Sequence, residues 1–161
     1  MSAQHSNTPA SAETVNPRAV ATPARQGGKT MEDAAVKGAA GLRALNRTRS
    51  TVLCEQLEEA GGMRGKSRGL LGRDGLAPGT GMLFEAGWME PFMCMHMFFM
   101  RFAIDIVFLD GGGRVIRVSH NLRPWRLSPI VWGARKALEL PSGSAAQTGT
   151  EVGDQVTLER T

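Results

Sequence analysis

Residues 94–110 read CMHMFFMRFAIDIVFLD and form the longest dense apolar run in the 161-residue chain. Five of the six phenylalanines lie within this run or just before it. From Met100 to Phe108 every even-numbered residue is apolar, whereas Arg101 and Asp105 occupy odd positions. Side chains along a β-strand alternate between the two faces of a sheet. The run therefore predicts a strand beginning at Met100, with a fully apolar inner face and with Arg101 and Asp105 on the outer face.

A hairpin is predicted directly after this strand. The sequence DGGGR at 110–114 is a turn signal, and a second strand is expected at 115–121. With a three-residue loop, Phe108 faces Ile116 and the apolar residues of both strands share one face. A two-residue loop would place apolar residues opposite polar ones. We prefer the first register because a one-residue slip would turn the apolar face away from the core.

The rest of the chain is divided into short segments separated by glycine and proline. Further strands are predicted at 50–57, 82–84, 137–140 and 155–159, and short helices at 63–73 and 142–148. The second helix would be capped by a serine and end at Gly149. Many short strands with no strand–helix–strand repeat predict an all-β fold. We expect a compact barrel-like or jelly-roll-like sandwich with one or two short helices.

The first 46 residues differ in composition from the rest. They are rich in Ala, Thr, Ser, Gly and Pro, contain no aromatic residue, and carry five Lys or Arg against three acids. Such a segment buries too little apolar surface to offset the entropy of ordering. We therefore predict a disordered low-complexity tail at 1–46, with a weak helix signal at 31–45, followed by a single domain at 47–161. A partner-binding arm is the alternative interpretation of the tail.

Charge and cysteine content restrict the class of protein. The net charge is +4 and the basic residues are spread along the chain, which is typical of a solvated surface and argues against nucleic acid as a partner. Two cysteines, Cys54 and Cys94, provide neither a disulfide framework nor a CxxC metal site. No signal peptide and no 18-residue apolar span is visible. We expect a cytoplasmic protein without a membrane span or a cofactor.

Several short motifs together resemble a known family. They are RGLLGR at 68–73, GMLF at 81–84, HMFFMRFAIDIVFLD at 96–110, GRV at 113–115, LEL at 138–140 and GD at 153–154. In order and spacing they resemble the bacterial and archaeal domain-of-unknown-function family numbered 192, over about residues 47–160. The resemblance implies a compact, mostly β domain and no established activity, substrate or cofactor. The family more often has Thr at the position of Met97 and Pro at that of Ala103.

The residues around His96 also permit metal or nucleophile chemistry, and both are disfavoured. Cys94 and His96 are two ligands, whereas zinc needs three or four. The neighbouring methionines are typical core filler, so no metal is expected. As a nucleophilic pair on one strand face, Cys94 and His96 would lie about 7 Å apart, which is long for a hydrogen bond, and no third residue orients them.

Two functional hypotheses remain from the residues. A non-catalytic module that binds a small anionic ligand or a protein partner is preferred, because guanidinium groups and an aromatic face suit such a ligand. Its binding residues would be Arg73, His96, Arg101, Asp105, Asn121, Trp125 and Arg135. The alternative is a hydrolase- or isomerase-like enzyme in which His96 and Asp105 act as an acid–base pair. A third interpretation places the activity in the N-terminal tail.

Overall fold

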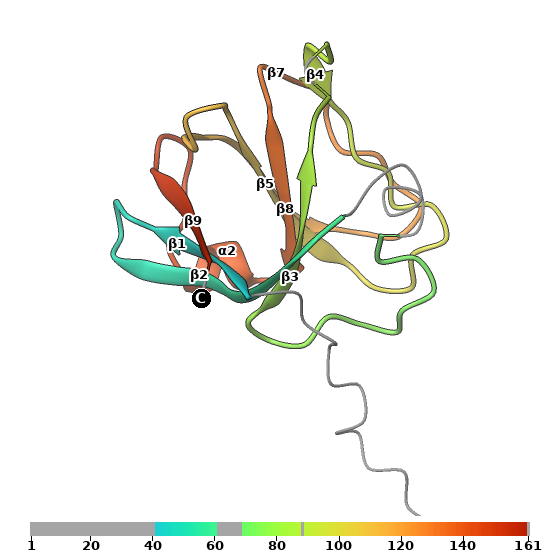
Figure 1. Ribbon diagram of the computed structural model, residues 1–161. Helices are drawn as coiled ribbons and strands as arrows, with labels where there is room; N and C mark the ends of the chain where they lie inside the picture. The colour runs from blue at the N-terminus through green and yellow to red at the C-terminus, as the bar shows by residue number, and fades with distance from the viewer. Residues whose placement is uncertain (1–40, 61–68, 88, 161) are drawn as a thin grey trace, which may run out of the picture. The chain divides into compact units, whose positions relative to one another are not determined.

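The computed structural model describes residues 41–60, 69–87 and 89–160, which form one curled sheet with a short helix (Figure 1). The sheet has seven strands in the order β6-β5-β8-β3-β2-β1-β9. In chain order they are β1 (Leu42–Asn46), β2 (Thr51–Glu59), β3 (Thr80–Glu85), β5 (Ile104–Leu109), β6 (Val115–Leu122), β8 (Lys136–Pro141) and β9 (Val156–Arg160). Neighbouring strands are antiparallel except β2 and β3. The all-β prediction is confirmed.

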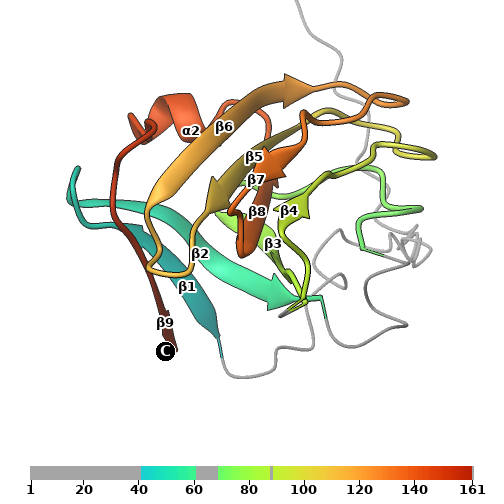
Figure 2. The same cartoon turned by 90° about the horizontal axis from the view of Figure 1, so that it is seen from above.

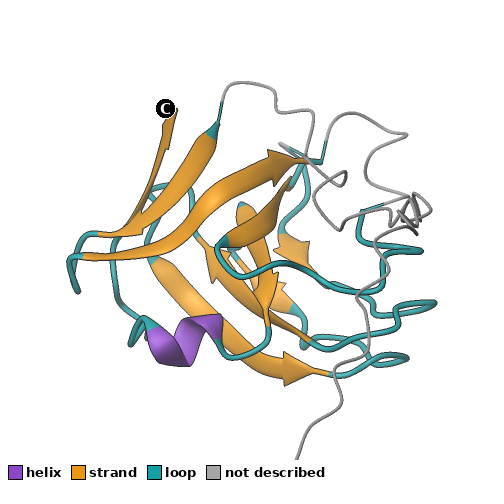
Figure 3. Cartoon of the chain, turned by 90° about the horizontal axis from the view of Figure 1, so that it is seen from below, coloured by secondary structure: helices purple, strands orange, loops and turns teal. Residues whose placement is uncertain are grey.

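Three smaller elements complete the fold. Strands β4 (Phe92–Met93) and β7 (Val131–Trp132) pair with each other outside the main sheet. The helix α2 (Ser144–Gln147) follows β8 and contributes Ala145 to a buried cluster. Figure 3 shows this helix beside the strands, and long loops gathered at the other side of the molecule. Among the described residues, no helix has the length and apolar character needed to cross a bilayer.

The two edges of the sheet meet at one end, where the curl becomes a half-barrel (Figure 2). Arg114 and Gln155 form an isolated antiparallel bridge there. Two backbone bonds flank it: the Val115 N–H donates to the Asp154 carbonyl over 2.8 Å, and the Val156 N–H donates to the Gly113 carbonyl over 2.9 Å. The edge strands β6 and β9 thus satisfy part of each other's backbone, which limits the exposed edge of the sheet.

Both faces of the central strands are buried, against two separate apolar clusters. One face packs with α2, β1, β2 and β9, and the other packs under the long loops that carry Met93, Met97, Met100 and Val131. All six residues of β5 are buried. Ile104, Ile106 and Phe108 belong to the second cluster, while Val107 and Leu109 belong to the first. The predicted solvent-facing side of this strand does not exist, because both faces lie in apolar cores.

The predicted start and register of the central hairpin are wrong. The strand begins at Ile104 rather than Met100, and Phe108 lies opposite Arg117 rather than Ile116. Bulges interrupt the pairing near each end of β5. A strand that is buried on both faces has no polar side to mark the correct register, so matching apolar residues on one face could not determine it.

Asp105 lies inside the protein and not on an outer face. Its side chain is fully buried and accepts three backbone hydrogen bonds, from the N–H groups of Asn121 at 2.8 Å and of Gly143 and Ala145 at 3.0 Å each. The N-cap of α2 is Gly143, at φ 91°, with no side-chain cap of its own. The predicted serine cap is therefore wrong, because Asp105 supplies the capping oxygen from a neighbouring strand.

The sheet also begins earlier than expected. Strand β1 occupies 42–46, which the sequence assigned to the tail, and it pairs with both β2 and β9. Its last residue, Asn46, is fully buried and donates to Asp154 over 2.9 Å and to Thr150 over 3.1 Å. The sheet therefore includes Leu42–Asn46, which lie before the predicted boundary at Arg47. The remainder of the predicted tail, 1–40, and most of the predicted helix at 63–73 lie outside the described residues. Of that helix, 69–72 form turns instead.

Removing the Asp105 carboxylate should destabilise the domain strongly. In Asp105→Ala, three backbone N–H groups lose a charged acceptor, so we expect a loss of roughly 3–5 kcal/mol in the free energy of unfolding, measured by urea titration. Asp105→Asn keeps one carbonyl oxygen for Gly143 and Ala145, and should lose about half as much. The exposed Asp74→Ala is the control, with a change of less than about 1 kcal/mol. A loss of similar size in Asp74→Ala and Asp105→Ala would contradict this role.

Candidate functional site

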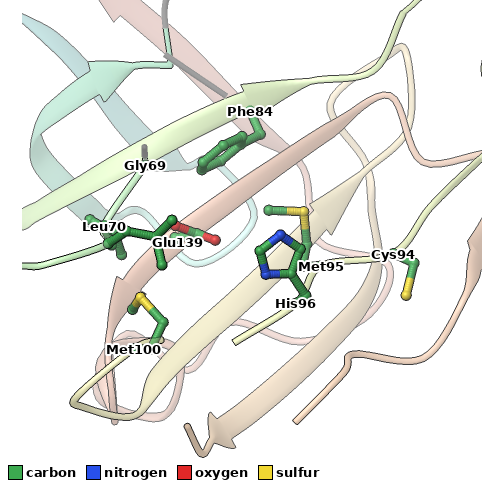
Figure 4. Close-up of a pocket in the computed structure, with 9 residues that line it drawn as sticks. Gly69, Leu70, Phe84, Cys94, Met95, His96, Met100 and Glu139 are labelled. Atoms are coloured by element: carbon green, nitrogen blue, oxygen red, sulfur yellow. The ribbon is translucent and has the colours of Figure 1, made fainter. Parts of the chain in front are cut away.

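A pocket of about 200 Å³ opens on the loop-covered face of the sheet (Figure 4). Its wall is mostly apolar, with three ionisable side chains. The lining residues are Gly69, Leu70, Leu71, Phe84, Cys94, Met95, His96, Met100 and Glu139. They come from β3, β8 and the loops before β3 and β5, so segments far apart in sequence form one concave surface. An apolar pocket with a few polar groups is the usual form of a small-molecule site.

Glu139 is the unusual member of this wall. It sits on the central strand β8, opposite Met82 of β3 and Ile106 of β5, and is only 6% exposed. Within the part of the chain that the structure describes, no group donates a hydrogen bond to its carboxylate. Burial raises the pKa of the Glu139 carboxyl from its ordinary value of 4.5 to about 7. The pocket therefore holds an acid that changes charge near neutral pH.

His96 is the one predicted site residue that lines the pocket. It forms an isolated bridge with Leu127, and its ring stacks on Phe98 with centroids 5.4 Å apart. In Figure 4 its imidazole lies beside Met95, on the side of the pocket across from Leu70. His96 remains exposed, whereas Glu139 is buried. The two groups therefore place one solvated and one desolvated titratable side chain around the same space.

Buried Ser128 fixes the wall that carries Cys94, Met95 and His96. Its Oγ accepts from the Met95 N–H at 2.9 Å, and its own N–H donates to the Met95 carbonyl at 2.8 Å. The Cys94 thiol donates to the Ser128 carbonyl over 3.4 Å. This wall is thus held by three bonds to one residue, which preorganises the pocket in the absence of any ligand.

The predicted anion-binding groove is not assembled. Each of its other members has a different local contact: Arg73 donates to Glu58, Arg101 to Asp74 and Arg135 to the Glu90 carbonyl, Asn121 accepts from Ser142, Trp125 packs on Phe99, and Asp105 holds backbone amides. None of them lines the pocket. The positions of the arginines in the sequence could not reveal these contacts, because every contacting residue is distant along the chain.

The predicted His96–Asp105 acid–base pair is also not formed. Asp105 alternates with Ile104 and Ile106 along β5, so its side chain points to the face that holds α2, away from the cluster that surrounds His96. All three of its hydrogen bonds within the described residues come from backbone amides, which makes it a structural residue. Among the described residues, no group of three His, Cys, Asp or Glu side chains is placed to hold a metal ion.

Sequence analysis missed Glu139, although its strand was predicted. The available signal was an acid between Leu138 and Leu140 in a short apolar strand. An acid in a strand buried on both faces must be paired, neutral or functional, since burying an isolated charge is strongly unfavourable. That reasoning required knowing that β8 is central, which the sequence did not show.

This chain belongs to the domain-of-unknown-function family 192, described as Uncharacterized ACR, whose profile matches residues 45–158. Two uncharacterised relatives, both called UPF0127 proteins, come from Thermococcus sibiricus and Pyrococcus abyssi. The first is 37% identical over 65 residues, which is 40% of this chain and 42% of the relative. The second is 36% identical over 80 residues, 49% of this chain and 68% of the relative. The match thus spans less than half of the Thermococcus protein.

Two crystal structures share the fold. One is a protein of unknown function from Novosphingobium aromaticivorans, with a TM-score of 0.63 and 24% identity, over 73% of this chain and 83% of that one. The other, from Sinorhizobium meliloti, is called "a putative transcription regulator"; its TM-score is 0.61 and its identity 25%, over 72% of this chain and 90% of that one. These structures therefore share the fold of this chain, and the role named for the Sinorhizobium protein is said of that protein alone.

Replacing Glu139 by Gln should change how stability depends on pH. Between pH 4.5 and about 7 the unfolded chain has an ionised Glu139 while the folded protein keeps the proton, so rising pH favours unfolding until the folded group also ionises near pH 7. The total effect is about 3 kcal/mol. Glu139→Gln lacks it, so its stability relative to the wild type should rise by up to that amount between pH 4.5 and pH 8 in urea titrations.

Comparing the two proteins at each pH cancels the other titrating groups. The most relevant is Asp154: burial opposes its ionisation, but hydrogen bonds from Asn46, Glu151 and Arg49 lower its pKa overall. Asp154 is identical in both proteins, and the stability that it contributes is lost at acidic pH. A wild-type-minus-variant difference that stays constant from pH 4.5 to pH 8 would contradict the raised pKa of Glu139.

Proposed function

We propose that this domain is a small-molecule-binding module whose site is the Glu139 pocket. The observation that carries the proposal is a buried carboxyl, without a hydrogen-bond donor in the described part of the chain, facing a preformed apolar cavity. Burying a carboxyl without a hydrogen-bond donor costs free energy of desolvation. A hydrogen bond donated by a ligand can offset that cost. At about 200 Å³ the pocket is smaller than the roughly 300–1,000 Å³ usual for drug-sized ligands, so a compact ligand fits best.

The charge of the lining favours a ligand with a basic nitrogen over the anionic ligand expected from the arginines. Those arginines are engaged elsewhere, and Glu139 would repel an anion once it ionises. An ammonium group would instead pair with the Glu139 carboxylate, and its apolar body would contact Leu70, Phe84, Met95 and Met100. Buried charge pairs of this kind form only with good geometry, which gives selectivity among amines.

The test is calorimetric titration with small alkyl and aralkyl amines, and with carboxylates of matched shape. Ammonium binding requires ionised Glu139, whose fraction rises about tenfold between pH 6 and pH 8 for a pKa near 7. The apparent affinity for an amine should rise by a similar factor, and Glu139→Gln should abolish both the binding and its pH dependence. Exposed Glu59→Gln is the matched control and should bind as the wild type does. Tighter binding of the carboxylates, or amine affinity independent of Glu139, would refute the proposal.

A second candidate function is proton transfer by Glu139 and His96. It is favoured by one observation: two titratable groups line the same pocket, and one has a pKa near the pH at which acid–base catalysts work best. This pair replaces the His96–Asp105 pair. Deuterium exchange into small carbonyl compounds, followed by NMR, and hydrolysis of chromogenic esters would detect it. Activity equal in the wild type and in His96→Ala and Glu139→Gln would exclude this role.

A further inference from the structure

We infer that two adjacent loops form a docking surface for anionic phospholipid bilayers. The surface, called here the aromatic tip, consists of Phe98, Phe99, Arg123, Trp125, Arg126 and Leu127. The two loops project side by side at the end of the molecule away from β9, as both Figure 1 and Figure 2 show. The inference does not depend on the Glu139 pocket, which these six residues do not line.

The loop conformation of the aromatic tip leaves the rings of Phe99 and Trp125 exposed to solvent. Met97 and Met100 are buried in the core, and the Met100 N–H donates to the Met97 carbonyl, so the two residues between them lie at the top of a tight turn. Phe99 is 69% exposed and Trp125 is 59% exposed. Their rings contact each other edge to face, with centroids 4.9 Å apart. Neither ring therefore contributes its large apolar surface to the core.

Both exposed aromatics have a backbone conformation that bulky residues avoid. Phe99 has φ 62° and Trp125 has φ 63°, in the left-handed region where glycine and asparagine are favoured. The loops are tied together in this state: the Trp125 N–H donates to the Met97 carbonyl at 2.9 Å, and the Met97 N–H donates to the Arg126 carbonyl at 2.8 Å. Unfavourable backbone at an exposed aromatic pair is a mark of a functional surface rather than of a stabilising one.

The charge around the tip is positive. Residues 91–104 and 122–134 contain three arginines and no acid. Arg101 pairs with Asp74, but Arg123 and Arg126 are exposed and make no ion pair in the part of the chain that the structure describes. Exposed aromatic rings beside arginines match the interface of an anionic bilayer, where the rings sit at the headgroup level and the guanidinium groups meet phosphates.

The shape favours a bilayer over a peptide or a nucleic-acid strand. A peptide needs a groove, and Phe98, Phe99 and Trp125 line neither the Glu139 pocket nor the neighbouring pocket between Phe84 and Met95. A single strand stacks its bases on free ring faces, whereas Trp125 contacts the rings of Phe98 and Phe99, and Phe98 also stacks on His96. A projecting aromatic tip can insert its rings into the headgroup region of a bilayer.

The test is co-sedimentation of the full chain with vesicles of phosphatidylcholine, with and without phosphatidylserine. The protein should pellet with the phosphatidylserine vesicles and be released by high salt. Arg123→Gln combined with Arg126→Gln should weaken binding roughly thirtyfold, because each arginine near the surface contributes about 1 kcal/mol. Arg117→Gln, an exposed arginine on β6, is the matched control and should bind as the wild type does.

Phe99→Asn combined with Trp125→Asn tests the rings without harming the fold. Asparagine accepts the left-handed backbone, so this variant should unfold at the same temperature as the wild type or higher, and yet lose vesicle binding. Val152→Asn, which removes an exposed apolar residue elsewhere, should bind normally. Equal binding to neutral vesicles, no binding to either vesicle, or full binding by the asparagine variant would overturn the inference. So would binding to a single-stranded oligonucleotide that these variants lose while vesicles fail to bind.

Discussion

The three hydrogen bonds to Asp105 are the constraint on which the centre of this fold depends. The carboxylate extends from β5, the strand next to the edge strand β6, and holds the end of β6 and the beginning of α2, which are 16 and 38 or more residues away. A buried carboxylate is tolerable only when its oxygens accept several strong bonds. Because two separate segments supply those three bonds, the carboxylate fixes their positions relative to β5.

Glu139 is a second buried acid, on the strand β8 that pairs with β5. It lies one position away from the residue that pairs with Asp105. Asp105 pairs with Leu140, and Ile106 pairs with Glu139, so the two acids point to opposite faces of the same sheet. One carboxylate is satisfied by backbone amides and is structural. The other lines a mostly apolar pocket, and burial raises its pKa to about 7. The two acids differ because the two faces of the sheet present different groups: backbone amides to Asp105, and a mostly apolar pocket to Glu139.

The long segment between β3 and β5 has two roles. Their methionines, Met93, Met97 and Met100, close the second apolar cluster over the sheet, which confirms the expectation that these residues fill core. The residues between the methionines cannot enter that core and are left facing the solvent or the pocket. His96, Phe98 and Phe99 are placed in this way. Core packing of these three methionines therefore determines which side chains in this segment face the solvent or the pocket.

The sequence alone determined the class of fold, the family, the positions of most strands and the core role of the methionines. These properties depend on local patterns such as alternation, turn residues and motif spacing. Such patterns can be recognised without knowing which distant segments pack against each other. Only the tertiary structure decided the register of β5, the burial of Asp105, the dispersal of the predicted arginines and the importance of Glu139. All four depend on which distant segments cover each face of the central strands. Because β5 and β8 are buried on both sides, their sequences contain no polar face from which that arrangement could be predicted.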